Sequence, residues 1–207
     1  MSPFLLDNDV VRKVSQYSLV NEFLNTCVDP KATFILPTLK YVFRLKDRDE
    51  ARRILGGEAP LQAMEWFVSS LQELRDNPPV ETLALFQDAD GIDVGEAVLF
   101  SIATTWDSSL TITGDKRALV ALADLSHQLG LIEKLSGRLK CLEQVVAEMM
   151  LNGFETQVID KVHGWRWDRA LGICFNSRGA SDALECLSSY YKDLDRSCRG
   201  MLAPFPR

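Results

Sequence analysis

The chain has 207 residues, of which 46% are hydrophobic and 25% charged, and its formal net charge is −6. This composition is typical of a globular protein with one domain and an extension, or with two small domains. No apolar run reaches membrane-spanning length, and the negative charge argues against a protein that coats nucleic acid by bulk electrostatics. A nuclease is still allowed, because metal-binding acids would contribute to that negative charge.

Strand-like and helical segments alternate along the first 130 residues. Short apolar runs predict strands, at 4–7, 32–37 and 110–113, with a further short strand and a loop at 81–93. Apolar residues spaced by three and four predict helices, at 38–55, 60–77, 93–106 and 115–129, besides one that follows residue 7. This alternation indicates a parallel sheet that helices cover on both faces.

Beyond residue 131 the pattern becomes helical, and the last five residues are expected to be a loose end or a docking strip. We predict helices there, over 137–154, 155–165 and 181–202. Between the last two, Trp165 and Trp167 alternate with arginines. Such a pattern fits a core anchor, a partner interface or a surface on which single-stranded bases stack.

The five cysteines are scattered, odd in number, and form no C-x-x-C pair. This usage favours reduced thiols in the cytoplasm over a disulfide framework or a zinc site. We therefore expect a cytoplasmic protein with buried, inert thiols and no membrane segment.

Three carboxylates are expected to meet at one edge of the sheet. Asp7 ends the first strand, Asp115 follows the strand at 110–113, and Glu96 lies in the first turn of the helix before it. The carboxyl ends of parallel strands line the ligand crevice of open α/β sheets. Two such acids 4 Å apart repel by roughly 4 kcal/mol at an effective dielectric of 20, and a divalent cation removes that repulsion. The chemistry suggested is metal-assisted attack of water on a phosphodiester.

Each of these acids also has a purely structural interpretation. Asp93 and Glu96 match the D-x-x-E capping box, and Asp115 can be a plain N-cap. Asp7 and Asp9 can cap the first helix in the same way. Spacing alone leaves both interpretations open.

Several segments together resemble PIN-domain ribonucleases, over roughly residues 3–155. "FLLDNDVV" is similar to the first strand of that family, and Asp7 stands at the position of the family's invariant acid. "GIDVGEAVLFSIA" resembles the D-x-G-E-A segment of one branch, and "LTITGDKRAL" its T-x-D strand end. "GRLKCLEQVVAEMMLNGF" resembles the segment that follows the core in that branch.

The resemblance implies a three-layer α/β fold with a central, mostly parallel sheet flanked by helices. The nuclease domain would span residues 1–155, and a helical extension would span 156–207. Asp7, Glu96 and Asp115 would hold Mg²⁺ or Mn²⁺, with Asp93 as a supporting catalytic acid. Thr113 would orient the last of these carboxylates, Asp115, or a water. Three cations are candidates to hold the substrate phosphate, namely Lys40, Lys116 and Arg117.

The function implied is a metal-dependent endoribonuclease, similar to bacterial toxins that a small antitoxin or inhibitor protein restrains. One position departs from the family, since many of its members carry an acid near Lys40 and this chain has none there. The lysine can contact the phosphate, or the site can be degenerate. Alternatives are therefore a PIN-like scaffold that binds a partner without cleavage, and a DNA or structure-specific nuclease; a homo-oligomer is also open.

Overall fold

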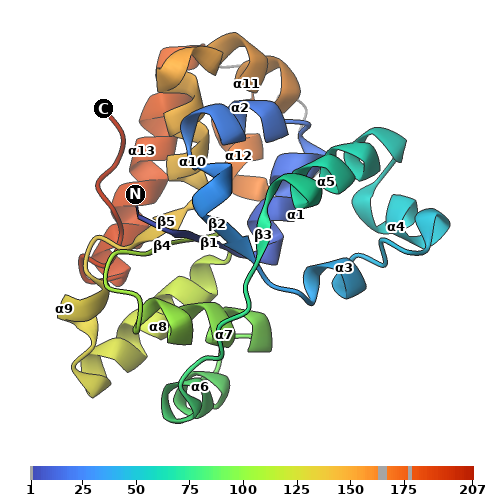
Figure 1. The fold of residues 1–207 in the computed structure, drawn as a ribbon. Coiled ribbons are helices and arrows are strands. Elements are labelled where there is room, and N and C mark those ends of the chain that lie inside the picture. Colours follow the sequence, from blue (N-terminus) through green and yellow to red (C-terminus); the bar gives the residue numbers. More distant parts are fainter. Residues whose placement is uncertain (1, 163–166, 177–178) are drawn as a thin grey trace.

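A five-stranded parallel sheet lies at the centre of the computed structural model, which describes residues 2–162, 167–176 and 179–207 (Figure 1). The strand order is β3-β2-β1-β4-β5, so the chain adds strands first on one side of β1 and then on the other. In register, Leu6 of β1 pairs with Ile35 of β2 and with Ile112 of β4. The strands are β1 (Phe4–Leu6), β2 (Thr33–Ile35), β3 (Gln72–Glu73), β4 (Leu110–Thr113) and β5 (Leu139–Cys141).

Helices cover both faces of the sheet, which gives the three-layer α/β architecture expected from the sequence (Figure 1). Side chains alternate between the faces of a strand, and β1 follows this rule. Leu6 belongs to a buried cluster with Val10 and Phe23, whereas Leu5 belongs to a second cluster with Phe100. The predicted fold class is confirmed.

The helices lie in chain order between and after the strands. The first half contains α1 (Asn8–Gln16), α2 (Val20–Thr26), a 3₁₀ turn (Pro30–Ala32), α3 (Leu39–Val42), α4 (Arg48–Leu55), α5 (Glu58–Ser70), α6 (Val80–Gln87) and α7 (Val94–Ala103). The second half contains α8 (Lys116–Leu129), α9 (Ile132–Leu135), α10 (Leu142–Met149), a π-helical segment (Met150–Phe154), α11 (Glu155–Val162), α12 (Arg169–Cys174) and α13 (Ala180–Ser197). None of the helices described is long and apolar enough to cross a membrane.

Two predicted elements between β2 and α7 are wrong. The single helix at 38–55 is divided into α3 and α4, because the backbone turns at Arg44, which adopts φ 52°, and Asp47 starts a new helix by capping Glu50 N. The strand predicted at the start of 81–93 is instead α6, which buries Phe86, whereas the loop predicted after it is present over 88–93. Packing against α7 decides this segment, since its apolar content alone fits a strand as well as a helix.

Two strands were also missed. The predicted helix at 60–77 ends at Ser70, and the two residues of β3 follow it. Residues predicted as the start of a helix at 137–154 form β5, which continues directly into α10. Both missed strands directly adjoin a predicted helix, and two or three residues carry too little periodicity to be separated from the helical pattern beside them.

The last residues of the chain lie along β5. Leu139 forms a parallel bridge with Leu202, and the Gln144 side-chain amide donates to the Ala203 carbonyl over 2.7 Å. The Phe205 ring packs against Tyr191 of α13, with centroids 5.2 Å apart. Of the two expectations for residues 203–207, the docking strip is the one the structure confirms.

The C-terminal extension shares a core with the rest of the chain, because Val158, Leu171 and Leu187 belong to the same buried cluster as Leu6. The Trp167 ring lies against Gly56, where it would clash with any Cβ, so this tryptophan acts as a core anchor. Trp165 and the arginine beside it lie outside the described residues. The boundary at residue 155 stays a prediction.

A disulfide joins Cys174 of α12 to Cys186 of α13. The expectation that all five cysteines are reduced thiols is therefore wrong for this pair. Their spacing of twelve residues gave no sign of the bond, which depends on how two helices pack. Cys27, Cys141 and Cys198 are free and buried, as expected.

Candidate active site

A cleft of about 1040 Å³ opens at the carboxyl ends of β1 and β4, where the strand order places the switch point of the sheet. Six carboxylates line it, against two arginines, and we call it the acidic cleft. The acids are Asp7, Asp9, Asp76, Asp93, Glu96 and Asp115, and the arginines are Arg12 and Arg75. All four acids predicted to be catalytic are thus brought together at one site.

Asp7 is the most central of these acids, because it follows β1 directly and its side chain is buried. Its N–H donates to the Ile112 carbonyl over 3.0 Å, which continues the ladder between β1 and β4. The Thr113 hydroxyl donates to Asp7 Oδ2 over 2.9 Å. Burial raises the pKa of Asp7 to about 6; the Thr113 bond opposes this, and the charges of Asp9 and Asp93 add to it. Asp7 occupies the N-cap position of α1 but makes no side-chain cap, so the capping interpretation is wrong for it.

Asp93 and Glu96 form the capping box expected at the start of α7. Asp93 Oδ1 accepts from Glu96 N over 2.8 Å, and Glu96 Oε2 accepts from Asp93 N over 2.9 Å. Glu96 is only 4% exposed. Burial raises its pKa to about 8; the Asp93 N–H opposes the rise, and the nearby charges of Asp7, Asp93 and Asp115 add to it. Capping therefore fixes these two acids in the cleft, and it leaves a buried carboxyl among like charges.

Asp115 caps α8, and it is better compensated than the other acids. Its Oδ1 accepts from Arg117 N over 2.8 Å and from Ala118 N over 3.3 Å, and Arg117 Nη2 lies 3.3 Å from Oδ2. Burial acts to raise the pKa of Asp115, but the hydrogen bonds from Arg117 and from the two backbone N–H groups outweigh it, so the pKa is lowered. The plain N-cap interpretation is confirmed for this residue.

Thr113 links the first and the last of these acids. Besides donating to Asp7, its hydroxyl oxygen accepts the Asp115 N–H over 3.1 Å. The side chain is fully buried and does not line the cleft. It therefore orients the Asp7 carboxylate and the backbone at Asp115.

The predicted phosphate ligands differ in their surroundings. Lys40 Nζ lies 2.6 Å from Glu73 Oε1 of β3, and Lys40 is not among the residues that line the acidic cleft. Lys116 Nζ pairs with the buried Glu143 of α10. Arg117 is 88% exposed and has Asp115 as its ion-pair partner. Whether these cations contact a substrate stays a prediction.

Sequence reasoning missed two arginines of the acidic cleft. Arg12 lies one turn after Asp9 on α1 and pairs with it, and this spacing of three was visible in the sequence. Arg75 lies between β3 and α6, a segment whose strand was not recognised. Both add positive charge to the lining of the acidic cleft.

The donor chemistry of the cleft fits a hard divalent cation, because carboxylate oxygens are the ligands that such ions take. Within residues 2–162, 167–176 and 179–207, no lysine or arginine forms an ion pair with Asp7, Asp93 or Glu96. In the same residues no hydrogen-bond partner occupies Glu96 Oε1 or Asp93 Oδ2. Among the described residues, no group of three or more His, Cys, Asp or Glu side chains is arranged so that it could hold a metal ion. Capping thus fixes Asp93 and Glu96, and one oxygen of each stays available.

No family model matches the chain, and no curated protein or solved structure matches it significantly.

Proposed function

We propose that this protein is a metal-dependent endoribonuclease of the PIN-like kind, which hydrolyses RNA phosphodiester bonds in the acidic cleft. One observation carries the proposal: Asp7, Asp93 and Glu96 line one cleft at the switch point of the sheet and have no cationic partner among the described residues. Asp7 and Glu96 are buried, and buried like charges without a counter-ion are costly to a fold. A site that binds a cation gives a reason to keep them.

Asp7, Glu96 and Asp115 would hold Mg²⁺ or Mn²⁺, and Asp93 would support them. When bound, the cation supplies Lewis-acid polarisation of the phosphoryl oxygen and lowers the pKa of water. The hydrolysis forms a bond between water oxygen and phosphorus, breaks the bond to one ribose oxygen, and transfers a proton to that leaving oxygen. Thr113 fixes the Asp7 carboxylate, which receives its hydroxyl hydrogen bond. Arg12 and Arg75 also line the cleft, and Arg75 would be a cation near the substrate phosphate.

A second function has an observation in its favour. The wall of the acidic cleft that follows β2 is neutral, since its lining residues are Leu36, Pro37, Thr38, Val42 and Phe43. A PIN-like scaffold that binds a partner without cleavage would match this neutral wall. Its partner would be a protein that presents an arginine or lysine to the acids, which is also how a small inhibitor would restrain an active toxin.

The experiment is cleavage of labelled single-stranded RNA with Mn²⁺, Mg²⁺ or EDTA, with single-stranded and duplex DNA as parallel substrates. Native protein is compared with Asp7→Asn and with Asp90→Asn, an exposed residue outside the cleft that serves as a charge-matched control. We expect the native protein and Asp90→Asn to cut RNA only with metal. In Asp7→Asn the cleavage rate should fall by more than about 100-fold, which is the largest loss typical when a residue that supports a metal ligand is changed. Folded native protein that cuts no nucleic acid would favour the scaffold function. Faster cutting of DNA than of RNA would mean that DNA is the substrate.

A further inference from the structure

A second cleft, of about 560 Å³, continues from the acidic cleft and carries the opposite charge balance. The two share Asp9, Arg12 and Asp115 in their linings. Five lysines and arginines line the second cleft, against three aspartates, and we call it the basic cleft. The cations are Arg12, Lys13, Lys116, Arg117 and Arg169.

The basic cleft is assembled from segments that are far apart in the chain. Lys13 of α1 lies between two acids, 2.8 Å from Asp9 Oδ2 and 2.7 Å from Asp168 Oδ2, and it is nearly buried. Asp168 also caps α12 by accepting from Leu171 N over 3.0 Å. This ion triad therefore holds the start of α12 against α1, beside the acidic cleft.

Three of the five cations are held by internal contacts, among them Arg12, which pairs with Asp9. Arg117 and Arg169 are the two that are available. Lys13 is neutralised as described, and Lys116 pairs with buried Glu143 while its ammonium lies 4.8 Å from the Tyr190 ring centroid. Arg117 is exposed, with a single ion pair at 3.3 Å. Arg169 is exposed and makes no ion pair within the described part of the chain.

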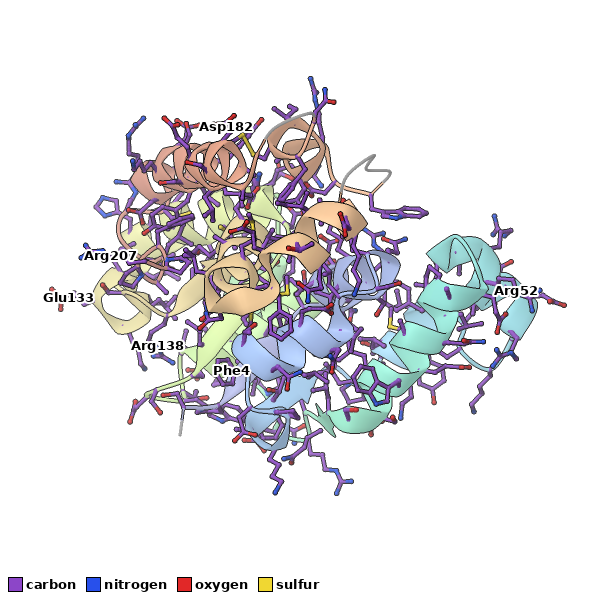
Figure 2. The ribbon with its side chains drawn as sticks, turned by 90° about the horizontal axis from the view of Figure 1, so that it is seen from above. Phe4, Arg52, Glu133, Arg138, Asp182 and Arg207 are labelled. Carbon is purple, nitrogen blue, oxygen red and sulfur yellow. A yellow bond between two sulfur atoms is a disulfide. The ribbon has the colours of Figure 1, made fainter. Side chains whose placement is uncertain are left out.

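A denser run of basic residues lies elsewhere, but it is neutralised. Arg48 pairs with Glu58 and Glu65, and Arg53 pairs with Glu50, so α4 and α5 cancel their own charge. Figure 2 shows Arg52 of this run at the outer edge of the molecule. The chain as a whole has a net charge of −6. A polyanion that reaches the acidic cleft therefore needs a local basic surface, and the basic cleft is contiguous with that site.

We propose that the basic cleft binds the phosphodiester backbone of single-stranded RNA on one side of the bond that is cut, with Arg117 and Arg169 each contacting a phosphate. The inference rests on the proposed function for the location of the cut. Basic grooves that follow the backbone are the general means of holding single strands. The C-terminal extension then has a role, because α12 and α13 contribute Arg169 and Tyr190 to this surface.

The test measures binding of a labelled single-stranded RNA by fluorescence anisotropy in EDTA, over a range of salt concentrations. The variant is Arg169→Glu. The fold should tolerate this change, because Arg169 is the first residue of α12 and an acid is favoured in the first turn of a helix. The control is Lys192→Glu, an exposed residue of α13 outside both clefts with the same change in charge. We expect Arg169→Glu to raise Kd about tenfold and to reduce the slope of log K against log salt by about 0.7, the value for one phosphate contact on a single strand. Arg117→Ala should reduce the slope by a similar amount.

Equal weakening by Lys192→Glu would overturn the inference, since it would mean that net charge alone governs binding. Native affinity in Arg169→Glu, or no RNA binding by the native protein, would overturn it too. The outcome is separable from that of the proposed function. Weaker binding in a protein that never cuts RNA supports the basic cleft and rejects the nuclease. Cleavage with an unchanged KM in Arg169→Glu supports the nuclease and rejects the basic cleft.

Discussion

The acidic and basic clefts lie next to each other and share three residues, but they are stabilised differently. In the basic cleft, the buried charge of Lys13 is enclosed by two carboxylates at hydrogen-bond distance. In the acidic cleft, Asp7 and Glu96 are equally buried, yet the charges that act on the pKa of each are those of other acids. The first arrangement is complete in the protein alone, and it fixes one helix against another. The second gives Asp7 and Glu96 no ion-pair partner within the described part of the chain, as expected of a site whose partner comes from solution.

The largest effect should follow removal of one acid from the acidic cleft. Glu96→Gln keeps an oxygen that can accept from Asp93 N, and it removes one buried carboxyl. We expect more than a 100-fold loss of RNA cleavage, together with stability in EDTA at least equal to that of the native chain. Cleavage rates and urea denaturation measure both. A variant that loses activity and stability together would mean that Glu96 serves only as a cap.

The disulfide tests how far the basic cleft depends on its scaffold. It ties α12, which carries Arg169, to α13, which carries Tyr190. In a paired Cys174→Ser and Cys186→Ser variant, the free energy of unfolding should fall by roughly 2–3 kcal/mol, the value for a loop of this length. RNA binding should weaken while the metal dependence of cleavage stays unchanged. Native protein in reducing buffer is the matched control, and it should reproduce the loss in urea denaturation.

Two threonines of β4 offer a smaller and sharper comparison. Thr113→Val removes the donor to Asp7 and the acceptor of Asp115 N, and should cost about 1–3 kcal/mol of stability and reduce cleavage. Thr111→Val is the control, because the buried Thr111 hydroxyl has no partner in the described residues. That variant should be neutral or stabilising and should cut at the native rate. If both variants behave alike, Thr113 has no special role in orienting Asp7.

The smallest effect should come from the most basic stretch of the sequence. A paired Arg48→Ala and Arg52→Ala variant removes charges that Glu58 already neutralises at the surface. RNA affinity is expected to change less than twofold, since exposed ion pairs contribute little and these residues line neither cleft. The anisotropy assay applies here without alteration. Strong weakening would move the RNA surface from the basic cleft to α4 and α5.

The sequence was most informative about the acidic cleft. Asp7 and Asp115 each follow a strand, and parallel strands place such residues at one edge. The D-x-x-E spacing also predicted the capping box that holds Asp93 and Glu96. These features are local patterns combined with one rule of topology, and both can be read from a chain.

The basic cleft could not be found in the same way. Arg12, Arg117 and Arg169 come from three separate segments, and their positions depend on how α12 packs against α1. The sequence alone also suggests more free positive charge at the basic run of α4 than the structure leaves there. The glutamates that neutralise Arg48 belong to the following helix, α5. Ion pairing between elements decides which cations are available, and it is settled only by packing.

The docked C-terminal strip has a consequence for association between molecules. Leu139 N–H donates to the Met201 carbonyl and its own carbonyl accepts from Ala203 N over 2.7 Å, so these backbone groups of β5 are already paired. An unpaired strand edge is a template for aggregation through added strands. A chain that ends at Arg199 would expose this edge of β5. It would also expose the side chains of Leu194 and Cys198, which are buried in the same cluster as Met201. The strip thus protects the sheet from self-association, at the end opposite to β3 in the strand order.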